Sequence, residues 1–263
     1  ALVSIMVALP LLFAPFRALI GFKSDSHKSF LGWRRVPYIW IGSWLQFGGF
    51  AIMPFALLVL GGMGQAANAP PWVGHLGAGM AFLLVGAGMQ VTQTAGLALA
   101  SDVSPDDKRP RVVALMYAMQ LMGLVVGSGV LSHLLSDFSP LRLIQVIQGC
   151  AVTVVLFNIT SLWKQEAKGV KRGARDADGF NTNWGLLMAV PRMRRFLWTV
   201  GLGTAAFSMQ DIVLEPYGGQ VLGLNVGLTS GLTALSAGGA LFAFALSARI
   251  LSKGMDACRL AAI

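Results

Sequence analysis

Two carboxylates lie four residues apart inside a long apolar run. Asp211 and Glu215 belong to FLWTVGLGTAAFSMQDIVLEPYGGQ, and helical spacing puts both on one face. A carboxylate at the centre of a bilayer costs about 2.5–3.5 kcal/mol, whereas one Leu returns only about 0.3–0.6 kcal/mol. The two acids are therefore expected near the outer end of the span or facing a polar cavity, as a functional site or an outer cap. We predict that Asp211 faces the bundle interior and hydrogen-bonds another helix, while Glu215 caps the outer loop near Tyr217.

Other polar side chains also interrupt apolar runs. Gln90, Gln93 and Thr94 share one helical face of GMQVTQTAG. Polar groups in lipid face other helices or a cavity, so these side chains either bond between helices or line a ligand path. The candidate intramembrane polar site comprises Gln90, Gln93, Gln210, Asp211, Glu215 and Tyr217.

The remaining reactive residues do not form a catalytic pattern. His27, His75 and His133 are scattered, and Cys150 and Cys258 each occur singly in or beside apolar runs. The sequence contains no nucleophile–base constellation, no metal-ligand spacing and no phosphate-binding loop. We therefore expect a protein that is not an enzyme and holds no metal site of its own.

The composition indicates an all-α integral membrane protein. Hydrophobic residues make up 55% of the 263 residues and charged residues only 12%, against about 25% in a soluble domain. The apolar runs are continuous, whereas barrel strands alternate in short segments. The net charge of +9 does not indicate nucleic acid, because the basic residues lie between the apolar runs.

About seven transmembrane helices are predicted. They cover residues 1–20, 38–62, 73–100, 111–135, 141–162, 196–216 and 229–250. Every Lys and Arg except Arg142 then falls on one side, which is predicted to be cytoplasmic. Because the first span starts without a preceding loop and CRLAAI resembles the start of another run, we expect an incomplete fragment. At least one helix before Ala1 and several after Ile263 would be lacking.

The predicted spans divide into two helix bundles. Residues 1–162 form an N-terminal bundle lacking its first helix, and 196–263 begin a C-terminal bundle. The segment 163–195 reads as a cytoplasmic linker because it is charged and contains glycine. Its stretch NWGLLMAVPRMRRF is expected to lie on the membrane with its arginines at the headgroups. Within the first bundle, Gly123, Gly127 and Gly129 predict a seam for close helix packing.

Two connections carry candidate motifs that are expected to organise helix ends. The first, GFKSDSHKSFLGWRRVP, supplies an acid that is expected to accept hydrogen bonds from N–H groups at a neighbouring helix start. Its motif residues are Gly21, Asp25, Gly32, Arg34 and Arg35. The second, SDVSPDDKRPRVVAL, places Pro110 at an early helical position, and its motif residues are Asp102, Pro105, Arg109 and Arg111.

The first motif resembles the loop between the second and third helices of major facilitator superfamily transporters. It departs from them because Gly32 follows Asp25 by seven positions, where the superfamily usually has three. Three stretches resemble the PucC/LhaA proteins of purple phototrophic bacteria, the bacteriochlorophyll-delivery branch of that superfamily. They are SDSHKSFLGWRRVPYIWIG, QVTQTAGLALASDVSPDDKRPRVVALMY and MQDIVLEPYGGQVLGL.

This resemblance implies a major-facilitator-type helix bundle that assembles light-harvesting antenna complexes in the photosynthetic inner, intracytoplasmic membrane. It implies bacteriochlorophyll as a bound pigment, with antenna polypeptides and the reaction centre as candidate partners. The pigment magnesium takes an axial ligand, often His, so His75 and His133 are candidate pigment ligands or else interface residues. The alternative is a secondary transporter of a small solute, with Asp211, Glu215 and the glutamines lining its path.

Overall fold

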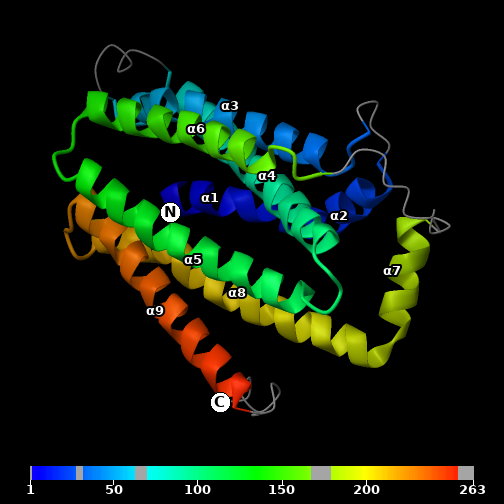
Figure 1. Cartoon of the computed structure of the whole chain (residues 1–263). Helices are drawn as coiled ribbons and strands as arrows, with labels where there is room; N and C mark the ends of the chain where they lie inside the picture. The colour runs from blue at the N-terminus through cyan, green and yellow to red at the C-terminus, as the bar shows by residue number, and fades with distance from the viewer. Residues whose placement is uncertain (1, 28–31, 63–69, 167–178, 254–263) are drawn as a thin grey trace. The chain divides into compact units, whose positions relative to one another are not determined.

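The computed structural model describes residues 2–27, 32–62, 70–166 and 179–253, in which every regular element is helical (Figure 1). The elements in chain order are α1 (Leu2–Ala8), η1 (Leu9–Phe16), α2 (Arg17–Ser26), α3 (Val36–Leu60), α4 (Pro71–Val103), α5 (Arg109–Leu134), α6 (Pro140–Leu162), α7 (Phe180–Ala189), α8 (Pro191–Gln220) and α9 (Val226–Ser252).

Seven helices in the described part of the chain are long and apolar enough to cross a membrane. The prediction of a multi-pass all-α membrane bundle is thereby confirmed. One span differs at its start, because α8 begins at Pro191 rather than near Phe196. Arg192, Arg194 and Arg195 therefore form the first turn of a long helix and do not belong to the short helix α7 that precedes it.

The first span is built from three successive segments. Pro10 and Pro15 lie in η1, a 3-10 helix between α1 and α2. Proline lacks the N–H that an α-helix interior needs, which favours the tighter, irregular turn. The helix then continues as α2 through Gly21 and Asp25, so these two motif residues are helical where the sequence predicted a loop.

Several helix starts follow local sequence rules. The side chain of Ser139 accepts a hydrogen bond from the N–H of Arg142 at 3.1 Å, and Pro140 opens α6. Asn225 caps α9 in the same manner, accepting from the N–H of Leu228 at 2.8 Å. Pro110 occupies an early position of α5, as predicted.

The described helices group into two compact units. The first consists of residues 1–105 and 139–212, and the second of 106–138 and 213–263. This grouping follows packing and not chain order, because α5 pairs with α9 in the second unit. The division into bundles at 163–195 concerns the chain's connectivity, and it stays a prediction.

In the first unit, α3 packs against α4 on one side and α6 on the other (Figure 1). The backbones of α3 and α4 approach closely through small residues. A Cβ added at Gly42 would lie 2.7 Å from the carbonyl oxygen of Gly88, and one at Gly49 would lie 2.7 Å from that of Ala81. Van der Waals contact between such surfaces holds helices together in lipid, where the hydrophobic effect between them is absent.

In the second unit, α5 packs against α9, and the two backbones approach closely at Gly227. The Ser132 hydroxyl donates a hydrogen bond to the carbonyl oxygen of Gly227 at 2.6 Å, across the two helices. The glycine seam predicted on α5 is not the contact surface, because no described atom lies within 4 Å of a Cβ built at Gly123, Gly127 or Gly129.

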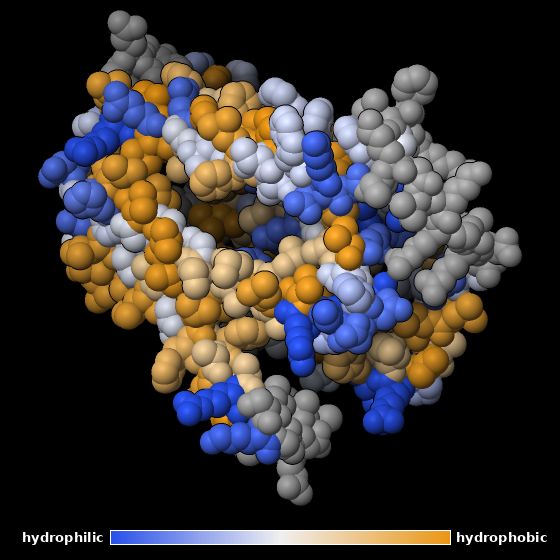
Figure 2. Space-filling view, viewed as in Figure 1, coloured by the Kyte–Doolittle hydropathy of each residue, from blue (hydrophilic) through white to orange (hydrophobic). Residues whose placement is uncertain are grey.

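Large apolar side chains face outward along the helices. Trp44 is 63% exposed, Phe157 71% and Trp163 70%. Figure 2 shows apolar side chains over much of the visible surface, with polar groups gathered in separate clusters. A surface of this kind is stable against lipid tails or other apolar helices, and it supports the membrane assignment.

Candidate functional site

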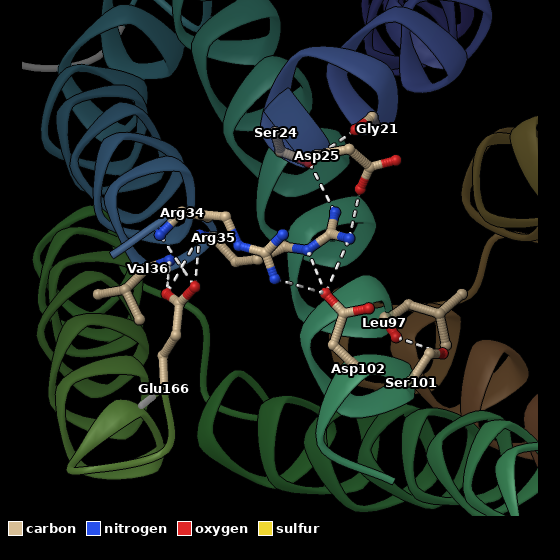
Figure 3. A network of polar contacts seen from close by, with 10 residues as sticks. All are labelled: Gly21, Ser24, Asp25, Arg34, Arg35, Val36, Leu97, Ser101, Asp102 and Glu166. Atoms are coloured by element: carbon tan, nitrogen blue, oxygen red, sulfur yellow. Dashed lines mark hydrogen bonds and ion pairs between the residues drawn. The ribbon is translucent and has the colours of Figure 1, made fainter. Parts of the chain in front are cut away.

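Arg35 is the centre of a charged network that joins α2, α3 and α4 (Figure 3). Its guanidinium is almost fully buried and donates to one oxygen of Asp102 through Nε at 3.1 Å and Nη2 at 3.0 Å. Nη1 donates to the Ser24 hydroxyl at 2.8 Å, and Nη2 also forms an ion pair with Asp25. The fork of donors thus contacts a side chain on each neighbouring helix.

The two acids in this network differ in exposure. The Asp25 side chain is 60% exposed, whereas that of Asp102 is 26% exposed and also lies 3.7 Å from Arg34. Asp102 is therefore the more desolvated partner of the Arg35 guanidinium. A buried cation requires such a partner, because desolvation otherwise costs several kcal/mol in order of magnitude.

Glu166 caps the beginning of α3 from the segment that follows α6. Its carboxylate accepts from the N–H groups of Arg34 at 2.9 Å, Arg35 at 3.1 and 3.2 Å, and Val36 at 3.0 Å. These N–H groups have no partner within the helix, and the negative charge is favourable at the positive end of the helix dipole. The sequence predicted such a cap but assigned it to Asp25, which instead pairs with the guanidinium.

We call these residues the Arg35 network: Ser24, Asp25, Arg34, Arg35, Asp102 and Glu166. The glycines of the first motif support it locally. Gly32 has a φ of +77°, which L side chains rarely adopt, and it leads the chain into the two arginines. The carbonyl of Gly21 accepts a hydrogen bond from the Ser24 hydroxyl at 2.8 Å.

Of the second motif, only Asp102 belongs to the Arg35 network. Arg109 pairs with Asp106 at 2.7 Å within its own connection. Pro105 and Arg111 are exposed, Pro105 in the connection and Arg111 in the first turn of α5. The structure thus joins one acid of the second motif to the arginines of the first.

The polar residues of α4 meet a cation, Arg17, that the sequence analysis counted only among the basic residues of the cytoplasmic side. Arg17 donates through Nε to the Thr94 hydroxyl at 3.2 Å and through Nη2 to Gln93 Oε1 at 3.4 Å. The Thr94 hydroxyl donates in turn to the carbonyl of Gln90 at 2.7 Å. We call Arg17, Gln90, Gln93 and Thr94 the Arg17 cluster. The apolar residues on both sides of Arg17, in FAPFRALIGF, are the signal that was available for placing it in a span.

The predicted acids of α8 are placed only in part. Glu215 Oε1 accepts from the Thr233 hydroxyl of α9 at 2.6 Å, so it bonds between helices and does not cap the loop as predicted. Tyr217 and Gln210 are exposed. The Asp211 side chain lies outside the described residues, and its role stays a prediction.

The candidate pigment ligands lie at helix ends, as their positions in the sequence indicated. His75 is half-buried near the start of α4, and His133 is exposed in the last turn of α5. In the described ranges, no three His, Cys, Asp or Glu side chains are grouped as a metal site would require. An imidazole can ligate a metal through one ring nitrogen, so either histidine would be able to hold a pigment magnesium.

Comparison with known proteins identifies a family. The family model described as PUCC protein matches residues 1–263. Protein PucC of Rhodovulum sulfidophilum is 54% identical, with 97% of this chain and 58% of that protein covered. Protein PucC of Rhodobacter capsulatus is also 54% identical, with 97% and 56% covered. An uncharacterized protein in the puhA-bchM intergenic region of Rhodobacter capsulatus is 50% identical, with 99% and 55% covered.

The chain spans somewhat more than half the length of these curated relatives. No solved structure matches it.

Proposed function

The chain belongs to the PUCC protein family, and we propose that it is part of a non-enzymatic factor that assembles bacterial light-harvesting antenna complexes. The observation that carries this proposal is the family match over residues 1–263. In this role the protein handles bacteriochlorophyll, newly inserted antenna helices, or both, in the inner, intracytoplasmic membrane. Its partners are the antenna polypeptides and the reaction centre.

The exposed apolar surface supports a role in shielding apolar partners. Trp40, Trp44 and Phe55 of α3, and Phe157 of α6, are each close to half exposed or more. Aromatic side chains offer large contact areas at low conformational cost, which suits flat pigment rings as well as antenna helices. The same surface also suits lipid tails.

The Arg35 network has a structural role in this proposal. It links the end of α2, the start of α3, the end of α4 and the segment after α6 through the Arg35 guanidinium and three carboxylates. These links hold the helix ends at a defined spacing, so that the apolar faces above them present a defined surface. The network sets the positions of the helices and does not itself contact the partners.

Pigment would be held by His75 or His133 in this proposal. The test is the absorption spectrum of pigment bound to the double variant His75→Leu/His133→Leu. His27→Leu is the matched control, because His27 packs edge-on against Tyr38 with ring centroids 5.3 Å apart. A changed spectrum in the double variant alone supports ligation, whereas an unchanged spectrum removes both candidates.

Gentle purification from pigmented membranes tests the proposal as a whole. Antenna polypeptides and bacteriochlorophyll are expected to co-purify, detected by mass spectrometry and absorption. A membrane protein of similar size from the same membranes serves as the control for adventitious pigment. Recovery of the protein without either component would contradict an assembly role.

The second candidate is a secondary transporter that works by alternating access. The observation that favours it is a cation on α2, Arg17, with polar partners on α4, within a candidate membrane span. Proton-coupled solute uptake in vesicles would support transport. Asp211→Asn separates the candidates, because it should abolish coupling in a transporter but mainly reduce antenna yield in an assembly factor.

A further inference from the structure

Arg17 is a charged side chain well inside a membrane-spanning segment. The candidate span runs from Ile5 to Asp25, so Arg17 lies eight residues, or about 12 Å of helix, from its charged end. The side chain is half-buried against α4. An ionised residue at such a position is expensive and is a functional candidate for that reason.

The partners of Arg17 are neutral. Its two hydrogen bonds, to Thr94 and Gln93, measure 3.2 and 3.4 Å, whereas a guanidinium bonded to a carboxylate lies at about 2.7–2.9 Å. Among the described residues no carboxylate pairs with Arg17, and its other N–H groups have no acceptor. Its positive charge is therefore solvated by two weak acceptors and is not neutralised there.

The α4 side of this cluster also has unused hydrogen-bonding capacity. Gln90 lies one turn from Thr94, is only 4% exposed, and its Oε1 has no partner among the described residues. Buried amide oxygens are nearly always bonded, so this oxygen can accept a hydrogen bond from a further polar group. Gln90 is linked to the cation through Thr94, which accepts from Arg17 and donates to the backbone carbonyl of Gln90.

The residues that precede Arg17 are apolar and exposed in the described part of the chain. Leu12 is 61% exposed and Phe16 is 53% exposed, both on the segment that leads into α2. Phe13 packs against Phe16 with ring centroids 6.2 Å apart. A group that approaches Arg17 along this surface does so beside hydrocarbon, which favours a molecule with its own apolar part.

We propose that Arg17 binds the anionic oxygen headgroup, carboxylate or phosphate, of a membrane-borne amphiphile. The guanidinium fork matches the geometry of such a headgroup, and the apolar part of the ligand lies along Leu12 and Phe16. Gln93 and Thr94 orient the guanidinium. The inference does not depend on the assembly role, because it concerns the chemistry of this one interface.

The test measures binding of a fluorescent long-chain fatty acid and of its methyl ester. The purified protein is placed in nanodiscs of neutral phosphatidylcholine, and both probes are titrated by fluorescence. The acid is expected to bind saturably and at least about tenfold more tightly than the ester, from one charge-assisted hydrogen-bond pair. Arg17→Gln should remove this preference, while Arg194→Gln, at an exposed arginine of α8, should keep it.

Equal binding of acid and ester to the unaltered protein would overturn the proposal, and this is the result if an acid elsewhere in the protein already pairs with Arg17. A preference that survives in Arg17→Gln would also overturn it. If Arg17→Gln does not fold, Arg17→Lys replaces it as the test variant. Because it keeps the charge, it should retain part of the preference for the acid over the ester. Displacement of the bound acid by excess inorganic phosphate would overturn the membrane-borne ligand and assign the anion site to soluble anions, whereas no displacement supports a lipid-borne one.

Discussion

Two arginines of the first unit contact α4, but one is paired with carboxylates and the other only with neutral side chains. Arg35 pairs with Asp102 and Asp25, so its charge is balanced by carboxylates of the same chain. Arg17 contacts only the neutral oxygens of Gln93 and Thr94 among the described residues. A cation paired with carboxylates of the same chain stabilises the fold. A cation in a span without such a partner is available to bind an anionic ligand.

The energetic consequences of the two arrangements differ as well. Removing one partner of a buried ion pair typically costs about 3–5 kcal/mol, because the other charge is left uncompensated. Removing the Arg17 side chain takes away two long hydrogen bonds from a charged donor, each of about 1.5–3 kcal/mol at most, but it also removes a partly desolvated charge, and the two terms oppose each other. Stability measurements can therefore separate the Arg35 network from the Arg17 cluster.

The largest effect is expected for Arg35→Met. This change leaves the half-buried Asp102 with only the longer contact to Arg34 and should lower the free energy of unfolding by about 3 kcal/mol. Thermal unfolding in detergent, together with the yield of folded protein in membranes, measures it. A loss below about 1 kcal/mol would mean that the network contributes no more to stability than a surface ion pair does.

Glu166→Ala should have the next largest effect. It removes the acceptor of three N–H groups at the start of α3, and a loss of about 1–3 kcal/mol is expected. Gln165→Ala is the matched control, because that side chain is exposed and adjacent in sequence. Equal unfolding temperatures for the two variants would contradict the capping role.

The loss of stability on replacing each of the two acids around Arg35 should be larger for the less exposed acid. Asp102→Asn is expected to cost about 1–2 kcal/mol, because its carboxylate is the more buried. Asp25→Asn should cost less than about 1 kcal/mol, because a solvated pair contributes little. Parallel unfolding curves measure both, and the reverse order would show that exposure does not govern the network.

The smallest stability change is expected for Arg17→Gln. It removes two long hydrogen bonds and also a partly desolvated charge, so the terms oppose each other and the net change should stay below about 1 kcal/mol. The same unfolding assay measures it beside Arg35→Met. A loss as large as that of Arg35→Met would show that the Arg17 charge is balanced within the protein.

The acid that caps α3 could not be identified from the sequence. The first N–H groups of a helix have no acceptor within it, and the sequence analysis expected Asp25 to supply one. The acceptor came instead from Glu166, more than a hundred positions away, because the ends of α3 and α6 lie together. The glycine seam shows the same limit, since close packing occurred at Gly42 and Gly49 and not along the glycines of α5.

The sequence by itself determined the membrane class, the number of spans and the polar positions within them. These depend on the length and continuity of apolar runs, and such properties are local. Only the tertiary structure decided which polar residues meet. A hydrogen bond or ion pair needs two atoms within about 3–4 Å, and packing between distant segments sets that distance. Thus Asp102 joined Arg35, and Arg17 met Gln93 inside the span.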